Sequence, residues 1–341
     1  MPFNFFRSRL FKDSSGLQPA AIEIPAALEA GEAHLDLKPH VYLDDGGFSR
    51  LDWEAVRTWV EHLDSPLRAM AWAQAEIAWL LRLRNDLGAA YRLEIQNGAA
   101  LVSSLDTNVA RSALDFMFRS RHRIFSIFDG IANPTEWGHD ILLVFEDDET
   151  YYRYLSHFYR EDGEFASSGG MFIDDGCSHF VAVKSDLSIF ESVIVHEMTH
   201  ACLSHLPLPV WIHEGLAVNT ERMLSPPFEP EAITARQMHE KHLAFWTAAR
   251  IQEFWSGKSW LRPDDGNLLS YDLARILISN FSEDWAKFKQ FLLKAQSSDS
   301  GYAAAVEYLG VDLGAAVCAV LGMEPDPEWS PLPSAWRGPD A

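Results

Sequence analysis

Two consecutive helices are predicted by the spacing of apolar residues in the middle of the chain. Between residues 189 and 202, apolar side chains recur close to the 3.6-residue period of one buried helical face. Ser188 with Glu191 three residues later has the form of a capping box, which favours a helix start. Pro207 ends the run, because proline cannot donate a helical hydrogen bond. A second apolar helix is predicted to begin around Pro209.

Regular structure is also predicted on both sides of this helix pair. In front of it, period-2 and period-3.6 patterns predict helices over 53–62, 66–85 and 107–129, strands over 91–95 and 141–145, and a helix after Asp147. Two apolar stretches around Asp175-Gly176 predict a β-hairpin. Behind the pair, helices are predicted over 231–255 and 268–281, followed by further packed helices.

These patterns divide the chain into four parts. Residues 1–48 have Ser, Gly and Pro punctuation with little periodicity, which predicts an irregular N-terminal arm. Residues 49–105 predict a mostly helical N-terminal section, and residues 106–323 a compact unit of strands and helices. Residues 324–341 are proline-rich and predict an extended tail. The expected fold class is therefore α+β.

Composition and charge narrow the class of partner. The chain has 341 residues, with 28 basic against 49 acidic ones, giving a formal net charge of -21. This sign argues against a nucleic-acid partner and against an anionic membrane surface. Three cysteines are too few for a disulfide framework, and no apolar run is long enough for a transmembrane segment. The first twelve residues lack the continuous apolar stretch of a signal peptide, so we expect a cytoplasmic protein.

The candidate chemistry lies on the first helix of the central pair, where residues 196–200 read His-Glu-x-x-His. His196 and His200 are four residues apart, so they lie one above the other on one helical face. Their imidazole nitrogens can then reach a single metal ion at about 2.0–2.1 Å. Glu197 lies beside them, placed to take a proton from a water that the metal activates.

A third metal ligand is expected on the second helix of the pair. Glu214 is the preferred candidate, because two histidines and one glutamate form one of the standard catalytic zinc sets. The adjacent His213 remains an alternative. His205 lies about 140° further round the first helix and is expected to face away. A metzincin would have glycine and histidine where this chain has Leu203 and Leu206, so that class is excluded.

Residues 211–217 read Trp-x-x-Glu-Gly-x-Ala, and together with the His-Glu-x-x-His helix they resemble the gluzincin metallopeptidases, which include thermolysin and the zinc aminopeptidases. The spacing is shorter than in the aminopeptidases, so the resemblance is to the clan. It implies one Zn²⁺ per chain, held by His196, His200 and Glu214, in a zincin-like catalytic domain with a small mixed sheet, an edge hairpin and a helical C-terminal part. It also implies a zinc-dependent metallopeptidase that cleaves a peptide or protein substrate, with Glu197 as the general base.

The resemblance implies two further features near the metal. In some gluzincins a tyrosine hydroxyl stabilises the tetrahedral intermediate, and Tyr271 is the match here. Extended peptides dock on a sheet edge in this clan, and either strand of the hairpin around Asp175-Gly176 could serve here, most plausibly residues 179–183. His179 on that strand, if it does not line the cleft, is expected to be a surface residue. His239 and His242 are expected to lie on a charged, exposed helical face rather than to act in catalysis.

One departure from the clan concerns the support of the metal-binding histidines. Thermolysin-like members have an aspartate four residues after the ligand glutamate, and here that position is Val218. Asn219 and Glu221 are nearby, but we expect them to point elsewhere on their helix. A second hypothesis follows: the chain is a zinc-binding protein of gluzincin fold that is catalytically silent and acts as a binding or regulatory module.

Overall fold

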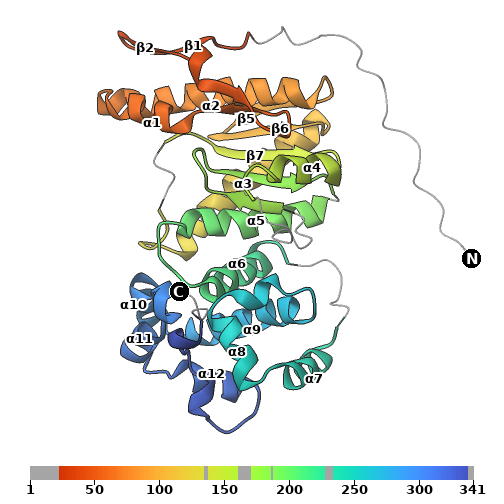
Figure 1. Cartoon of the computed structure of the whole chain (residues 1–341), viewed down its shortest axis with the longest axis vertical. Coiled ribbons are helices and arrows are strands. Elements are labelled where there is room, and N and C mark those ends of the chain that lie inside the picture. The colour runs from red at the N-terminus through yellow and green to blue at the C-terminus, as the bar shows by residue number, and fades with distance from the viewer. Residues whose placement is uncertain (1–22, 134–136, 160–169, 186, 227–232, 337–341) are drawn as a thin grey trace, which may run out of the picture.

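The computed structural model describes residues 23–133, 137–159, 170–185, 187–226 and 233–336. Helices and strands are mixed in it, as the α+β expectation requires. An upper part is built around a sheet, and a lower part consists of helices (Figure 1). Residues 1–22, which include much of the expected N-terminal arm, lie outside the described residues.

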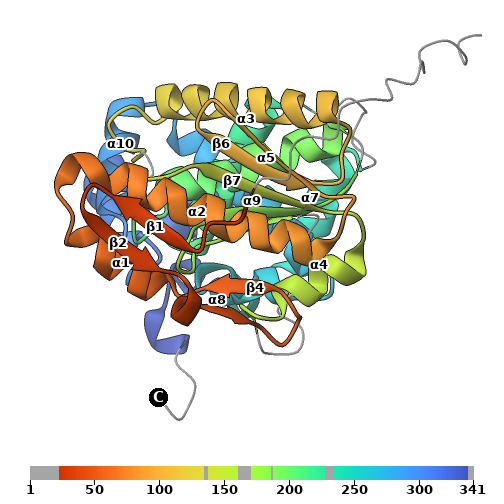
Figure 2. The ribbon, with the colours of Figure 1, turned by 90° about the horizontal axis from the view of Figure 1, so that it is seen from above.

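The front of the described chain is more regular than its sequence indicated. Residues 27–51, most of which were expected to be irregular, form two short antiparallel hairpins, and two helices follow. The elements are β1 (Ala27–Ala30), β2 (Ala33–Asp36), β3 (Val41–Leu43), β4 (Ser49–Leu51), α1 (Trp53–Glu61) and α2 (Ser65–Leu87). Seen from above, the β1–β2 hairpin lies over α2 (Figure 2). Strands as short as these have too few residues to show a clear alternation.

A five-stranded mixed sheet forms the centre of the upper part. Its order is β5 (Arg92–Gln96), β6 (Ala99–Ser103), β7 (Asp140–Phe145), β9 (His179–Val183) and β8 (Gly170–Ile173). The inner pairs β6–β7 and β7–β9 are parallel, and both outer pairs are antiparallel hairpins. Strand pairing therefore crosses the boundary that was expected between residues 105 and 106.

The sheet separates two hydrophobic cores. Along β7, Ile141, Leu143 and Phe145 enter the core shared with α1, α2 and the front hairpins. The alternate residues Leu142 and Val144 enter the core shared with the helices on the other face. Adjacent residues of a strand point to opposite faces, and a strand covered on both faces is apolar throughout. This explains the continuous apolar run in β7.

Three helices complete the upper part: α3 (Thr107–Ile127), α4 (Asp148–Leu155) and α5 (Leu187–Leu203). Asp147 caps α4 as expected, since its Oδ1 accepts a hydrogen bond from the backbone N–H of Thr150 at 2.8 Å. α3 and α5 pack against each other on the same face of the sheet. α5, which carries the His-Glu-x-x-His residues, therefore has the sheet above it and the lower helices beneath it (Figure 1).

The lower part begins with α6 and continues to the end of the described chain. Its helices are α6 (Val210–Leu224), α7 (Ala235–Phe245), α8 (Ala248–Trp255), α9 (Gly266–Phe281), α10 (Trp285–Lys294), α11 (Tyr302–Ala304) and α12 (Leu313–Val320). The single helix expected over 231–255 is thus two helices. Thr247 starts the second one by accepting a hydrogen bond from the backbone N–H of Arg250.

The proline-rich tail is not simply extended. It forms short 3₁₀ turns at Pro327–Trp329 and Pro333–Ala335, and Trp329 is buried. Trp255 donates its indole N–H to the carbonyl oxygen of Trp329 at 2.8 Å, which attaches the tail to the lower core. Residues 337–341 lie outside the described part.

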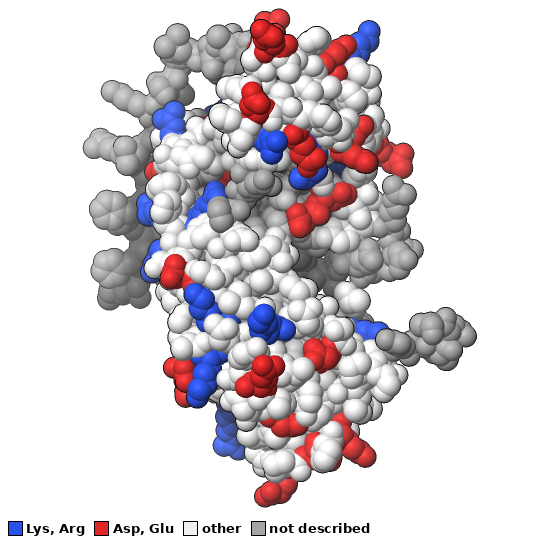
Figure 3. Space-filling model, turned by 90° about the vertical axis from the view of Figure 1, so that its left-hand side faces the viewer, with Lys and Arg blue, Asp and Glu red and all other residues white. Residues whose placement is uncertain are grey.

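Within the described residues, no single helix is long and apolar enough to cross a membrane. In this part of the chain, the bent helix pair Tyr302–Leu309 and Leu313–Val320 is long and apolar enough when its two helices are taken together. On the face drawn in Figure 3, acidic and basic side chains are interspersed among large uncharged areas.

Candidate metal centre

The candidate site lies between α5 and α6, and the close packing of α6 against α9 has a local cause. α5 ends at Leu203, and a turn containing Pro207 leads to α6. A Cβ added at Gly215 would come within 2.7 Å of the backbone oxygen of Ala274 on α9 and within 2.6 Å of Ile278. Only glycine permits this approach. The glycine next to Glu214 therefore allows α6 to lie directly against α9.

The capping box expected at Ser188 involves a side chain outside the described ones.

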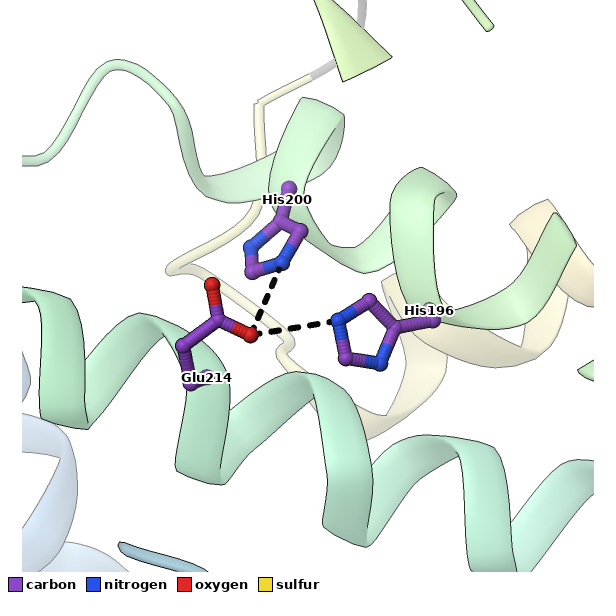
Figure 4. A group of neighbouring side chains, drawn as sticks. All are labelled: His196, His200 and Glu214. Atoms are coloured by element: carbon purple, nitrogen blue, oxygen red, sulfur yellow. Dashed lines mark hydrogen bonds and ion pairs between the residues drawn. The ribbon is translucent and has the colours of Figure 1, made fainter. Parts of the chain in front are cut away.

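The structure brings together the three expected ligands. Nε2 of His196 lies 3.2 Å, and Nε2 of His200 3.5 Å, from the same Oε2 atom of Glu214 (Figure 4). The three ligand atoms all lie within 4.8 Å of one another. A tetrahedral zinc ion with ligand distances of about 2.0–2.1 Å would separate its ligand atoms by about 3.3 Å. The two separations from Oε2 of Glu214 are close to this value, and two imidazoles with one carboxylate are ligands that zinc prefers, so the residues present fit a zinc ion.

The partner of His196 on its other ring nitrogen was missed by the sequence reasoning. Nδ1 of His196 lies 3.1 Å from Oε2 of Glu221. Glu221 was expected to point elsewhere, and this is wrong. Seven residues are almost two full helical turns, so Glu221 returns to the face of α6 that carries Glu214. The spacing of these two glutamates was the signal that could have identified it, and it supplies the carboxylate that Val218 cannot.

The two carboxylates also fix the protonation of His196. An ionised carboxylate only accepts hydrogen bonds, so Nδ1 must carry its hydrogen toward Glu221. Nε2 faces an oxygen of Glu214, so this position holds either a proton on Nε2 or a metal ion that both groups bind. Burial lowers the pKa of His196, but hydrogen bonds to Glu214 and Glu221 outweigh it and raise the pKa well above its usual value. Burial raises the pKa of Glu214, yet His200 and His196 lower it overall.

Glu197 is connected to the edge of the sheet. Its Oε2 accepts a hydrogen bond from the backbone N–H of Phe172 at 2.8 Å, and Phe172 belongs to β8. The amide of Phe172 therefore points away from β9, on the side of β8 that pairs with no other strand among the described residues. This corrects the expected docking strand: residues 179–183 form β9, which lies between β7 and β8, whereas β8 is the edge beside α5.

Tyr271 on α9 reaches the same site. Its ring centroid lies 6.4 Å from that of His196. Burial raises the pKa of Tyr271, and the negative charges of Glu214, Glu197 and Glu221 raise it further. The phenol is therefore protonated and can act as a hydrogen-bond donor. Its position agrees with the expected role of Tyr271 beside the reacting group, and that role remains a prediction.

The two alternative third ligands occupy different positions. The ring centroid of His213 lies 5.8 Å from that of His200, but His213 is not part of the group whose ligand atoms converge. Burial lowers the pKa of His213 to about 4, and His200 lowers it as well. His205 is exposed, in agreement with the expectation that it faces away.

Two other histidines are buried rather than exposed. His179 accepts a hydrogen bond from the hydroxyl of Tyr154 at 2.8 Å, and its Nδ1 donates to the carbonyl oxygen of Cys177. His242 contacts Asp272 through Nε2 and accepts the indole hydrogen of Trp246. The expected surface positions of both residues are wrong, because polar side chains with satisfied hydrogen bonds can be buried at modest cost. His239 is exposed as expected.

With this geometry established, the chain was compared with known proteins. No family model matches it, and no curated protein matches it either.

Proposed function

We propose that this chain is a zinc-dependent metallopeptidase of gluzincin type, with a zincin-like fold in its sheet and helix pair. One observation carries the proposal: the ligand atoms of His196, His200 and Glu214 lie within 4.8 Å of one another, close enough to hold one metal ion. Three protein ligands leave one position free, which is the arrangement of catalytic rather than structural zinc. Glu197 lies directly beside these ligands in the sequence.

Each of the residues around the metal position would have a separate role in peptide hydrolysis. Bound zinc supplies Lewis acidity and lowers the pKa of a water toward about 7. Glu197 is the general base: it takes the proton of the attacking water and delivers it to the leaving amine. Its hydrogen bond to Phe172 uses Oε2 and holds the carboxylate in one orientation. The hydroxyl of Tyr271 would donate a hydrogen bond to the oxygen that becomes negative during attack.

The substrate backbone would lie along β8. Phe172 and Gly170 occupy alternate positions of this strand, so their backbone groups face its open side. The amide of Phe172 is already bonded to Glu197, which leaves its carbonyl and the groups of Gly170 for an extended peptide. Strand addition of this kind uses backbone hydrogen bonds and is independent of the substrate sequence.

The test combines zinc stoichiometry with peptide cleavage. Zinc-loaded protein is incubated with a diverse peptide mixture, and the products are read by mass spectrometry. We expect cleavage by the wild type and its loss in Glu197→Gln, with one zinc bound per chain in both. Glu240→Gln is the matched control, since Glu240 is exposed on α7 and pairs with Arg236.

The opposite result has a clear meaning. Zinc bound by both proteins without cleavage by either would refute the peptidase and favour the catalytically silent binding module. Cleavage that persists in Glu197→Gln would show that Glu197 is not the base.

A further inference from the structure

A cavity of about 470 Å³ lies in the upper part, on the opposite face of the sheet from the metal-bearing helix α5. His179 of β9 lines it, and Val181, two residues further along the same strand, packs in the core shared with α1 and α2. Phe180 points to the other face and packs in the core that contains Met198 of α5. The cavity is therefore separate from the metal group, and its volume is that of a small-molecule site.

The inner surface of the cavity is largely aromatic. Trp79, Phe158 and His179 line it, and the ring centroids of Trp79 and Phe158 lie 5.2 and 5.8 Å from that of His179. Both ring nitrogens of His179 already have hydrogen-bond partners, so its imidazole contributes mainly apolar surface. Trp53, at the start of α1, adds a further ring. An apolar group of a ligand would be removed from water against these rings.

One charged hydrogen-bond donor is available within this surface. The side chain of Arg50 lines the cavity and is only 5% exposed. Its Nε and Nη2 each lie 2.7 Å from Oδ2 of Asp44, and Nη2 also donates to the carbonyl oxygen of Tyr154 at 3.2 Å. Nη1 has no partner among the described residues, yet in that part of the chain Nε1 of Trp260 is the one sealed side-chain nitrogen without a partner. Nη1 of Arg50 is therefore open to the cavity, as a donor for an acceptor group of a ligand.

The side of the cavity nearer to solvent has the opposite charge. The carboxylates of Asp52, Glu54 and Asp175 line it, and those of Glu54 and Asp175 are exposed. Arg57 also lines the cavity, and its Nη2 donates to the carbonyl oxygen of Gly176 at 3.4 Å. Three carboxylates thus outnumber the one arginine whose charge is not offset by Asp44. This excess favours a positively charged group of the ligand on that side.

We propose that this cavity binds a free amino acid with a large apolar side chain, of the size of phenylalanine. The carboxylate of the ligand accepts a hydrogen bond from Nη1 of Arg50, its ammonium group faces the three carboxylates, and its side chain packs on the aromatic rings. A purely anionic ligand would be repelled by the carboxylates, and a purely cationic one would leave Nη1 unpaired. The inference goes beyond the proposed function and does not depend on it.

Calorimetry with four probes on the full-length, zinc-loaded protein tests the ligand class. L-Phenylalanine is compared with phenethylamine, which lacks the carboxylate, with 3-phenylpropionate, which lacks the ammonium group, and with L-alanine. We expect one phenylalanine per chain and at least about tenfold weaker binding of each other probe. No binding of phenylalanine, or equal binding of any truncated probe, would overturn the proposal.

Two variants locate the ligand in the cavity. Arg50→Lys keeps a positive charge beside Asp44 but removes the free Nη1, so phenylalanine should bind at least about tenfold more weakly while phenethylamine binds as before. The second variant combines Glu54→Gln with Asp175→Asn at exposed positions. It should weaken phenylalanine at least about threefold and leave 3-phenylpropionate no weaker.

The matched controls for these variants are Arg236→Lys and Glu240→Gln, two exposed positions on α7. Unchanged affinity for phenylalanine in either cavity variant, when it is folded, contradicts the proposal.

Binding at the metal and binding in the cavity are distinguished by Glu214→Ala. This variant should bind phenylalanine as the wild type does, and loss of binding there would place the ligand on the metal and overturn the proposal. The proposed function and the cavity also fail separately. Cleavage of peptides without binding of phenylalanine would refute the cavity site alone, and binding of phenylalanine without cleavage would refute the peptidase alone.

Discussion

Replacing Glu221 should weaken zinc binding although Glu221 is not a ligand. Its carboxylate accepts the Nδ1–H of His196 at 3.1 Å, which fixes the ring so that Nε2 points toward Glu214. Removing such a partner of a metal-binding histidine typically lowers metal affinity by about 10–100-fold. The side chain of Glu221 is 31% exposed, so water screens part of its charge. We therefore expect the lower end, about tenfold to thirtyfold for Glu221→Ala.

The isosteric variant separates geometry from charge. In Glu221→Gln the amide oxygen can still accept the Nδ1 hydrogen, but the bond is no longer assisted by charge. Neutral hydrogen bonds contribute about 1 kcal/mol less than charged ones, so the loss should be smaller, about threefold to tenfold. A competition titration against a zinc-binding dye measures both constants. Glu240→Ala, an exposed carboxylate on α7, is the control.

The order of the affinities decides the interpretation. Wild type, then Gln, then Ala is the expected order of decreasing affinity. An affinity of Glu221→Ala within threefold of the wild-type value would refute the reasoning that Glu221 orients His196. A loss that is equal in both variants would mean that the charge alone matters.

Three further predictions follow from the buried and close-packed positions. His213→Ala should retain one zinc per chain, with a zinc affinity within about threefold of the wild-type value in dye competition. Glu214→Ala should lose tight zinc binding, because two protein ligands remain. The reverse result would make His213 the third ligand. Gly215→Ala should lower the free energy of unfolding by about 1–3 kcal/mol in urea titrations, because its Cβ meets the backbone of α9; an unchanged value would contradict the close approach. Burial lowers the pKa of His179 to about 3, so an unfolded chain takes up a proton below pH 6.5 that the folded chain does not. Wild type should therefore lose about 1.4 kcal/mol more stability than His179→Gln between pH 7.5 and 5.5, and parallel losses would refute the neutral buried imidazole.

The sequence was most informative where residues at fixed spacing belong to one helix. His196 and His200 share a face because four residues are close to one turn, and the structure places both rings toward Glu214. Strong period-3.6 patterns also located α3 and α9 well. The hairpin around Asp175-Gly176 was predicted by its turn residues, and β8 pairs with β9 as expected.

Tertiary relations could not be deduced in the same way. The apolar stretch beside the Asp-Gly turn identifies β9 as a strand, but its place inside the sheet depends on pairing with β7, which is distant in sequence. A histidine on a strand is usually expected at the surface. Here its hydrogen bonds to Tyr154 and Cys177 lower the free-energy cost of burying the imidazole of His179. The support of His196 by Glu221 was in principle visible from the seven-residue spacing. It differs from the clan's pattern, in which the supporting carboxylate stands at the position of Val218.

The contact at Gly215 has a consequence for how the lower helices open. α6 carries Glu214 and α9 carries Tyr271, and the absence of a side chain at residue 215 leaves their backbones in direct contact. Because the two helices are packed this closely, neither should unfold without the other, and local unfolding should involve both together. In native-state hydrogen exchange, the slowest amides of α6 and α9 should therefore share one opening free energy, while those of α7, which has a more exposed surface, should exchange earlier.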